Sequence, residues 1–445
     1  MQKILVANRG EVALRIIRAC RELGLDAVAV YSTADETARH VRVADEAVCV
    51  GKPAARSSYL NIEALVDAAR RTGAEAVHPG YGFLAENAAF ARACEEAGLV
   101  WVGPSPAAID QMGDKAVARE IARAAGVPVV PGTAAKLTLG EALRTAEDVG
   151  YPVMVKAAAG GGGRGIRVAH DPEELRDCIG AAAREAQAAF GDESLYLEKL
   201  IVNPRHVEVQ VLGDGEGGAI HLYERECSMQ RRRQKLLEES PAPNLELQTR
   251  EAMCAAAARL AAAVDYASAG TVEFIVDASG DFFFIEMNTR IQVEHPVTEM
   301  ITGIDLVKEQ LRIAAGESFD VLQGDVTPRG WAIEFRLNAE DPAAGFLPSP
   351  GEIAAVEVPG GPGVRVDSAI YGGYRVPPFY DSLIAKLIVW GRDREEAIAR
   401  GRRALSEFRI DGIKTTIPFH LRVLEEPSFL AGEYHTDSVA ELALV

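Results

Sequence analysis

The stretch FFFIEMNTRIQVEHPVTEM, residues 282–300, alternates polar and apolar side chains over more than ten positions. Successive side chains of an extended chain point to opposite faces. One face of this stretch would carry only polar groups: Glu286, Asn288, Arg290, Gln292 and Glu294. The other face is mostly apolar and expected to be buried: Phe283, Ile285, Met287, Thr289, Ile291 and Val293.

The polar face of this stretch has the composition of a ligand site. It combines carboxylates, amides and a guanidinium, whereas the alternative is an ordinary strand with a solvated outer face. At about 3.3 Å per residue, Glu286 and Glu294 would lie roughly 26 Å apart on a straight strand. They can serve one site only if the chain bends, so we predict that it leaves the sheet near Thr289 and curls back.

Length and composition are those of a soluble protein with two or three domains. The chain has 445 residues, 48% hydrophobic and 25% charged, and a formal net charge of -18. This charge argues against general binding to nucleic acids or anionic membranes. The six cysteines form no CxxC pair, and no run of 18 apolar residues or signal sequence is found. We therefore expect a cytoplasmic protein with reduced thiols.

The N-terminal third alternates predicted strands and helices, which is typical of a parallel sheet covered by helices on both faces. Strands are predicted over residues 3–7, 27–31, 74–78 and 99–102, and helices over 11–23, 62–71 and 88–96. The first turn, NRGE at residues 8–11, is not GxGxxG, so a dinucleotide site is not expected. The fold class predicted for this part is α/β.

Four consecutive glycines, residues 160–163, lie between two predicted strands and follow Lys156 closely. Such a loop allows close backbone approach to a ligand, and its N–H groups can surround phosphate oxygens. A flexible connector is the alternative. The loop lacks the GxxxxGK[ST] pattern, so it is not a Walker loop, and a mobile flap over phosphates is the interpretation we prefer.

A basic run and a carboxylate pair add to this nucleotide chemistry. The run QRRRQK at residues 230–235 is either a solvated face or a partner for a small polyanion. A predicted hairpin places Glu273 across from Glu286, with Asn288 on the same face. Hard oxygen ligands of this kind suit Mg²⁺ or Mn²⁺, whereas two exposed glutamates facing each other without a cation would be destabilising.

These motifs resemble the biotin carboxylase family of the ATP-grasp superfamily over essentially the whole chain. The segments that carry the resemblance are ANRGEVALRIIRAC, HPGYGFLAEN, MGDK, GGGGRG, NPRHVEVQVL, ECSMQRRRQK, FIEMNTRIQVEHPVTEM, EFRLNAEDP and PPFYDSLIAKLIVWG. The resemblance implies an N-terminal α/β domain at 1–112, an ATP-grasp region at 113–330 with a lid at about 131–203, and an α+β domain at 331–445.

The resemblance also implies roles for individual residues. The implied ATP-site residues are Lys115, Lys156, Gly162, Gly163, Glu198, Lys199, Leu200, Ile201, His206, Gln230, Lys235 and Ile275. The implied metal ligands are Glu273, Glu286 and Asn288, and the implied bicarbonate and biotin residues are Lys235, Arg290, Gln292, Val293 and Arg336. Glu294 would be the base. The other implied catalytic residues are Arg290, Lys235 and Arg336.

The activity implied by the resemblance is the ATP-dependent carboxylation of biotin with bicarbonate. The biotinyl-lysine motif of the family is absent, so biotin is expected on a separate carrier protein, with a separate carboxyltransferase. Acetyl-CoA is the expected final acceptor, in fatty-acid synthesis, and a homodimer is expected. Two positions depart from the family pattern: Ala159 stands before the four glycines, and Arg233 stands where the family often has histidine.

Two rival functions remain open. One is another ATP-grasp ligase, which would share the flap and the metal pair but activate a different carboxylate. The other is a non-catalytic nucleotide-binding subunit, which loss of a metal ligand or of Glu294 would have indicated. The sequence retains all of these residues.

Overall fold

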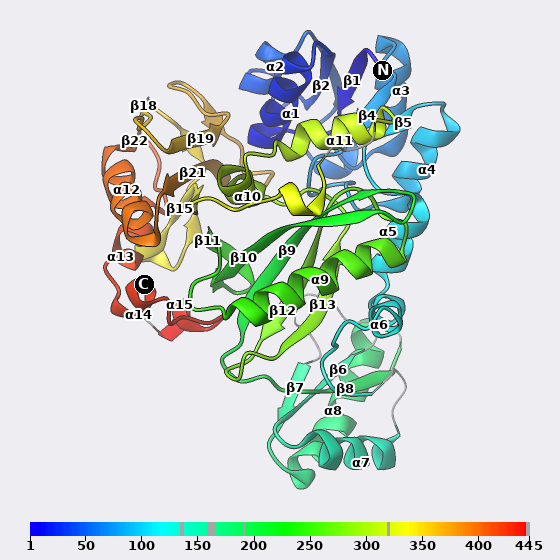
Figure 1. The fold of residues 1–445 in the computed structure, drawn as a ribbon. Helices are drawn as coiled ribbons and strands as arrows, with labels where there is room; N and C mark the ends of the chain where they lie inside the picture. The colour runs from blue at the N-terminus through cyan, green and yellow to red at the C-terminus, as the bar shows by residue number, and fades with distance from the viewer. Residues whose placement is uncertain (134–137, 158–165, 191, 318–320, 442–445) are drawn as a thin grey trace.

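The protein, described here from a computed structural model, begins with a parallel sheet (Figure 1). The structure describes residues 1–133, 138–157, 166–190, 192–317 and 321–441. The sheet has the order β3-β2-β1-β4-β5, with strands β1 (Lys3–Val6), β2 (Asp26–Ser32), β3 (Glu46–Gly51), β4 (Ala76–His78) and β5 (Val100–Trp101). Its helices are α1 (Gly10–Glu22), α2 (Arg39–Val43), α3 (Ile62–Thr72), α4 (Ala88–Glu96) and α5 (Pro106–Gly113).

The predicted alternation of strands and helices in this part is confirmed, but strand β3 was not predicted. β3 lies at the edge of the sheet, and only Val50 among its six residues is fully buried. An edge strand with a mostly exposed surface lacks the continuous apolar run that marks a buried parallel strand. The sequence of β3 therefore lacks the continuous apolar run from which the other strands were predicted.

A small unit lies apart from the rest of the molecule, at the bottom of Figure 1. Its antiparallel sheet has the order β7-β6-β8 and is covered by two helices. Its elements are α7 (Leu139–Val149), β6 (Val153–Ala157), β7 (Ile166–Ala169), α8 (Pro172–Phe190) and β8 (Leu195–Lys199). The glycine loop with Gly162 and Gly163 connects β6 and β7 and lies outside the described residues. Helix α6 (Lys115–Ala124) precedes this unit.

The largest sheet has eight strands in the order β13-β12-β9-β10-β11-β14-β21-β19, all paired antiparallel. Its strands are β9 (Arg205–Asp214), β10 (Ala219–Arg231), β11 (Gln234–Ser240), β12 (Ala267–Val276), β13 (Phe282–Asn288), β14 (Trp331–Asn338), β19 (Val364–Ser368) and β21 (Leu383–Gly391). Because β11 pairs with β14, one continuous sheet contains strands from both sides of position 331, where the C-terminal domain was expected to begin.

Helices and short strands cover this sheet and complete the chain. Helix α9 (Leu247–Ala263) packs on β9 and β10, and α12 (Arg394–Glu407) packs on β14 and β21. The other helices are α10 (His295–Thr302), α11 (Leu306–Ala314), α13 (Ile417–Val423), α14 (Pro427–Ala431) and α15 (Ser438–Glu441). The short strands are β15 (Glu340–Asp341), β16 (Leu347–Pro348), β17 (Gly351–Glu352), β18 (Ala355–Glu357), β20 (Arg375–Val376) and β22 (Arg409–Asp411). Three 3₁₀ turns span Ala55–Ser57, Gln323–Asp325 and Pro342–Ala344.

The hairpin of β12 and β13 has the predicted register at its polar end and a different one beyond it. Glu273 pairs with Glu286, as predicted, but a bulge follows, because Phe274 then pairs with Phe284. Phe284 is consequently the buried side chain, whereas Phe283 and Ile285 are only half-buried. The prediction that Phe283 and Ile285 belong to the buried face is therefore wrong, because the bulge interrupts the strict alternation.

The predicted bend after the hairpin is confirmed. Strand β13 ends at Asn288, and helix α10 starts at His295, with Glu294 as its N-cap residue. Three of the five polar side chains of this segment, Asn288, Gln292 and Glu294, are buried, whereas Glu286 and Arg290 are half-buried. No helix in the described part of the chain has the length and apolar character needed to cross a membrane.

Candidate active site

A cavity of about 570 Å³ lies where the bend meets the N-terminal sheet and strands β11 and β14. Loops at the carboxyl ends of parallel strands are the usual place for ligands in α/β folds. Sequence-predicted residues that line the cavity are Lys235, Glu273, Glu286, Asn288, Arg290, Gln292, Val293, Glu294 and Arg336. The structure therefore brings the predicted metal, bicarbonate and biotin residues together.

The bend is fixed by hydrogen bonds from Arg290 and from the backbone. Glu86, in the loop before α4, accepts from the Thr289 N–H at 3.1 Å and from Arg290 Nε at 2.8 Å. The Nη1 and Nη2 atoms of Arg290 donate to the side-chain oxygens of Gln292 at 2.9 Å and Asn288 at 3.1 Å. Glu86 of the N-terminal part thus holds the guanidinium at Nε. The other two nitrogens of the guanidinium contact only the oxygens of neutral amide groups.

Lys235 lies among three buried carboxylates. Its Nζ is 2.5 Å from Glu208, 2.7 Å from Glu294 and 3.0 Å from Glu273. Burial would lower the pKa of Lys235, but the negative charges of these three glutamates raise it well above its usual value. The lysine is therefore protonated at neutral pH, and it holds the metal-ligand candidate Glu273 and the base candidate Glu294 together.

Glu294 is shared between two cations. Arg336 Nη2 is 2.8 Å from one carboxylate oxygen, and Lys235 is bound to the other. Burial would raise the pKa of Glu294, but Lys235, Arg336 and Arg225 hold it well below its usual value. Glu294 is accordingly ionised, which is the form that a base requires.

Arg336 has a second carboxylate partner, Glu238 of β11. Its Nε donates to Glu238 at 2.6 Å, so the guanidinium bridges Glu238 and Glu294. Burial raises the pKa of Glu238 to about 7, although the charge of Arg336 opposes this change. Arg336 therefore reaches the cavity with its direction fixed by two acidic groups.

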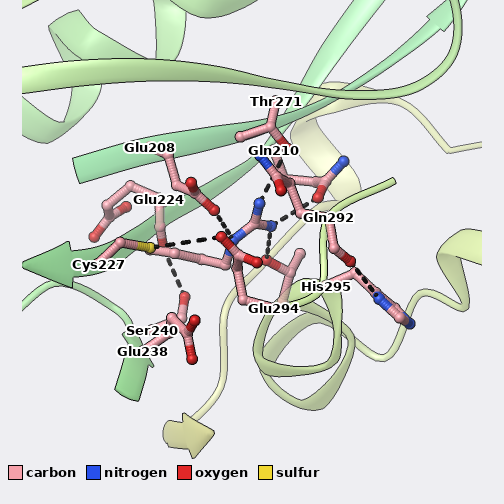
Figure 2. A network of polar contacts seen from close by, with 12 residues as sticks. Glu208, Gln210, Glu224, Cys227, Glu238, Ser240, Thr271, Gln292, Glu294 and His295 are labelled. Atoms are coloured by element: carbon pink, nitrogen blue, oxygen red, sulfur yellow. Dashed lines mark hydrogen bonds and ion pairs between the residues drawn. The ribbon is translucent and has the colours of Figure 1, made fainter. Parts of the chain in front are cut away.

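A fully buried arginine supports this arrangement, and its partners Glu208, Gln210 and Thr271 are labelled in Figure 2. Arg225 of β10 donates to Glu208 at 2.6 Å, to Gln210 at 2.7 Å and to Thr271 at 3.0 Å. It also donates to Thr298 of α10 at 3.0 Å. Because Glu208 in turn binds Lys235, Arg225 connects the sheet to both the lysine and the helix that starts at Glu294.

The carboxylates of Glu273 and Glu286, with Asn288, fit a divalent cation. The two glutamates are direct cross-strand partners, a placement that is destabilising for like charges without a cation. Burial and then the charge of Glu273 raise the pKa of Glu286. Asn288 donates its Nδ2 to Glu273 at 2.9 Å and so lies at the same place. Hard oxygen atoms of this kind are the ligands that Mg²⁺ and Mn²⁺ prefer.

A second cavity of about 690 Å³ lies between β13, α6 and the small unit. It is lined by the predicted residues Lys115, Lys156, Glu198 and Ile275 and by Arg119, Thr133, Tyr196 and Phe284. Glu198 forms ion pairs with both Lys156 and Arg119. Lys115 Nζ is 3.5 Å from Glu286, which also lines the first cavity, so the two cavities are adjacent at the carboxylate pair.

Five other predicted ATP-site residues within the described part of the chain do not line either cavity: Lys199, Leu200, Ile201, His206 and Gln230. Lys199 donates to the carbonyl oxygens of Gly150 and Tyr151, and Leu200 and Ile201 follow β8. His206 Nε2 is 3.0 Å from Glu273, and Gln230 is the cross-strand partner of Lys235. Arg233, the departure from the family pattern, lines the first cavity. Gly162 and Gly163 lie outside the described residues.

Sequence reasoning missed several residues that hold the site: Glu86, Arg119, Glu208, Arg225 and Glu238. Glu208 had a usable signal, since it alternates with Val207 and Val209 and therefore points away from an apolar face. The other four are single charged residues without a pattern. Their partners are distant in sequence, so their roles emerge only from the fold.

Three family models match consecutive parts of the chain. They are described as "Biotin carboxylase, N-terminal domain", "Carbamoyl-phosphate synthase L chain, ATP binding domain" and "Biotin carboxylase C-terminal domain", and they match residues 1–109, 114–322 and 334–441. Biotin carboxylase 1 of Bacillus subtilis is 58% identical over 438 residues, which are 98% of this chain and 97% of that protein. The chain belongs to the biotin carboxylase family. It is thus an ATP-dependent ligase.

Two further relatives show how broadly this biotin carboxylase fold is used. A pyruvate carboxylase subunit of Methanothermobacter thermautotrophicus is 54% identical over 440 residues, which are 99% of this chain and 89% of that protein. A solved structure is the dimeric biotin carboxylase domain of Hydrogenobacter thermophilus 2-oxoglutarate carboxylase, in complex with MgADP, ADP and bicarbonate. It is 52% identical with a TM-score of 0.90 and covers 99% of this chain and 97% of its own.

Proposed function

We propose that this chain carboxylates biotin on a separate carrier protein, with ATP and bicarbonate as the other substrates. The observation that carries the proposal is the bend after β13, which places Arg290, Lys235 and Glu294 around one cavity beside the carboxylate pair. An anion clamp and a base are thereby next to the place where a nucleotide's terminal phosphate would be bound.

The nucleotide belongs in the second cavity, with its phosphates toward the carboxylate pair. Lys115, Lys156 and Arg119 supply positive charge along that path. Glu273, Glu286 and Asn288 would hold Mg²⁺ or Mn²⁺, which would supply positive charge against the negative charge that develops in phosphoryl transfer.

Bicarbonate belongs between Arg290, Gln292, Val293 and Lys235. Arg290 can present Nη1 and Nη2 to a planar anion as two parallel donors when the anion replaces the neutral oxygens that they contact, those of Gln292, Asn288 and the Ile291 carbonyl. Glu294 accepts the bicarbonate proton, and a bicarbonate oxygen attacks the γ-phosphorus, which gives carboxyphosphate and ADP. The bound anion also competes for the hydrogens of Lys235, so it weakens the hold on Glu294 and makes that carboxylate a better base.

Biotin approaches the same cavity beside Arg336. Carboxyphosphate releases CO₂ and phosphate, and the phosphate takes the proton from the ureido nitrogen. The nitrogen then attacks CO₂, which gives carboxybiotin. Arg336 stabilises the negative charge that develops on the ureido oxygen by a charge-assisted hydrogen bond.

The proposed partners are a biotin carrier protein and a carboxyltransferase, in a homodimer of this chain. The dimeric neighbour from Hydrogenobacter thermophilus supports the oligomeric state. Acetyl-CoA is the acceptor that we propose, on the resemblance alone. Relatives named for pyruvate and 2-oxoglutarate carboxylases are 54% and 52% identical to this chain, so co-purification of the transferase is the experiment that distinguishes the acceptors.

ADP release measured with different carboxylates tests the reaction itself. We expect ADP release that requires bicarbonate and increases when free biotin is added. The rival ligase would instead release ADP with an amino acid or another carboxylate in place of bicarbonate. A non-catalytic subunit would bind ATP without releasing ADP under any of these conditions.

The affinity for ATP should fall as the pH rises through about 8. Burial, and then the positive charges of Arg119, Lys115 and Arg233, lower the pKa of Lys156 to about 8. Above that pH the lysine loses its charge, so a charge-assisted bond to a phosphate weakens and KM for ATP should rise by about tenfold. Steady-state KM values below and above pH 8 measure this change.

The variant Lys156→Arg is the matched control for this pH dependence. Its guanidinium stays charged over the whole range, so KM for ATP should stay flat where that of the wild type rises. Parallel curves for the two proteins would assign the pH dependence to another group.

A further inference from the structure

Two buried side chains hold successive carbonyl groups of the bend, that of Gln292 before the Val293 N–H and that of Val293 before the Glu294 N–H. Figure 2 shows the first contact, between His295 and Gln292. His295 Nδ1 is 2.8 Å from the Gln292 carbonyl oxygen, and Lys386 Nζ is 2.7 Å from the Val293 carbonyl oxygen. Both side chains are 0% exposed. Neither residue has a part in the reaction as described above.

The chemistry of the first contact fixes the state of the imidazole. A carbonyl oxygen only accepts hydrogen bonds, so Nδ1 of His295 carries the hydrogen and donates it. Burial, and then the charges of Lys386, Arg15 and Arg365, hold the pKa of His295 well below its usual value. The ring is thus the neutral Nδ1–H tautomer, and its Nε2 makes no hydrogen bond within the described chain.

Lys386 reaches the bend from strand β21. It lies in the middle of β21, as the cross-strand partner of Arg336 on β14 and of Asp367 on β19. Its Nζ is also 3.4 Å from Glu11 of α1. The lysine therefore ties the bend to the sheet that carries Arg336 and to the N-terminal helix.

Peptide geometry gives these contacts a consequence for the site. The Gln292 carbonyl and the Val293 N–H belong to one planar trans peptide and point in opposite directions. Holding the carbonyl therefore sets the direction of the N–H. Val293 is half-buried and lines the 570 Å³ cavity, and its N–H donates no hydrogen bond within the part of the chain that the structure describes.

We propose that His295 and Lys386 are a positioning pair that orients the Val293 N–H toward bicarbonate and fixes Glu294 at the start of α10. The inference rests on the proposed function, because it takes bicarbonate as the acceptor. A donor that is oriented before the anion arrives has no reorganisation to undergo during the reaction. The two side chains contact the bend from the interior of the protein. They bind its carbonyl groups there and do not compete for the anion.

Two substitutions of His295 test the pair without changing a charge. His295→Leu removes the donor, whereas His295→Asn keeps an N–H near the position of Nδ1. In bicarbonate-dependent ADP release, His295→Leu should raise KM for bicarbonate by about five- to tenfold, which corresponds to one lost hydrogen bond. KM for ATP should not change, and His295→Asn should recover most of the lost bicarbonate affinity.

The outcomes separate this inference from the function on which it rests. Wild-type protein that releases no ADP in response to bicarbonate overturns the proposed function. A wild-type response together with an unchanged KM for bicarbonate in His295→Leu overturns the positioning pair alone. Equal increases in both KM values, not recovered by His295→Asn, show a merely structural histidine and overturn it as well.

Substitutions of Lys386, which binds the Val293 carbonyl oxygen, supply an independent test. Lys386→Met keeps the length of the side chain and removes the donor, and Lys386→Arg keeps a charged donor. The pair predicts the same selective rise in KM for bicarbonate in the methionine variant, with recovery in the arginine variant. If the methionine variant does not fold, the His295 variants still decide the question, since their substitution leaves every ion pair intact.

Discussion

Replacing Glu294 by glutamine should lower biotin carboxylation by about a hundred- to ten-thousand-fold, the contribution typical of a general base. Glutamine keeps the shape of the side chain, and its one carbonyl oxygen can accept from Lys235 or from Arg336, which bind different oxygens of the glutamate. It cannot take the bicarbonate proton. The rate of bicarbonate-dependent ADP release should fall with it, since the proton leaves before or during attack on the γ-phosphate. ATP binding, measured by calorimetry, should be unchanged because Glu294 does not line the nucleotide cavity.

A buried glutamate outside the site is the matched control. Glu309 of α11 is 6% exposed and binds Arg312 at 2.6 Å, and it lines neither cavity. Glu309→Gln should retain wild-type turnover. Near-native turnover in Glu294→Gln would remove Glu294 from the role of base, and phosphate or water would then have to accept the proton.

Lys235→Met should both stop the reaction and destabilise the protein. Without the ammonium group, the carboxylates of Glu208, Glu273 and Glu294 remain buried around an apolar side chain. Removing one partner of a buried ion pair typically costs about 3–5 kcal/mol. We expect a loss of that size in the free energy of unfolding, measured with urea.

The loss of stability in this variant should depend on pH in a defined direction. With one cation fewer among them, the crowded carboxylates have higher pKa values in the folded variant than in the folded wild type, so the variant binds more protons on folding and gains stability at lower pH. The deficit relative to the wild type should therefore shrink as the pH falls from about 8 to 6. The surface pair of Lys3 and Glu46 supplies the control, since Lys3→Met should show neither effect. A pH-independent deficit in Lys235→Met would mean that packing, and not charge, is lost.

The hairpin and the bend could be predicted because they follow from local rules. The short turn sets a register that by itself would pair Glu273 with Ile285, and the bulge shifts this pairing to Glu286. A distance argument alone required a bend before Glu294. The bulge opposite Ile285 could not be predicted, since no glycine or proline marks it. The family and its ligase activity followed from long motifs, and the comparisons confirm them.

The residues that hold the site in place needed the fold. Glu86 and Lys386 are far in sequence from the bend that they contact, and Glu238 is far from its partner Arg336. Each is one charged residue without a periodic pattern. Asn288, Gln292 and Glu294 of the polar face also proved to be buried, and a sheet that includes strands from both sides of position 331 brings Arg336 and Lys386 to this region. A pattern of alternating polarity reports which side chains share a face, but not what covers that face.

The central claim is that bicarbonate itself is phosphorylated at the bend after β13. Bicarbonate labelled with ¹⁸O tests it most directly, because an oxygen of bicarbonate forms the new bond to the γ-phosphorus. When carboxyphosphate breaks down, that oxygen stays with phosphorus. Our account predicts one bicarbonate oxygen in each phosphate released during biotin carboxylation, detected by mass spectrometry under conditions of rapid turnover. Phosphate that carries only oxygen from ATP and water would contradict it.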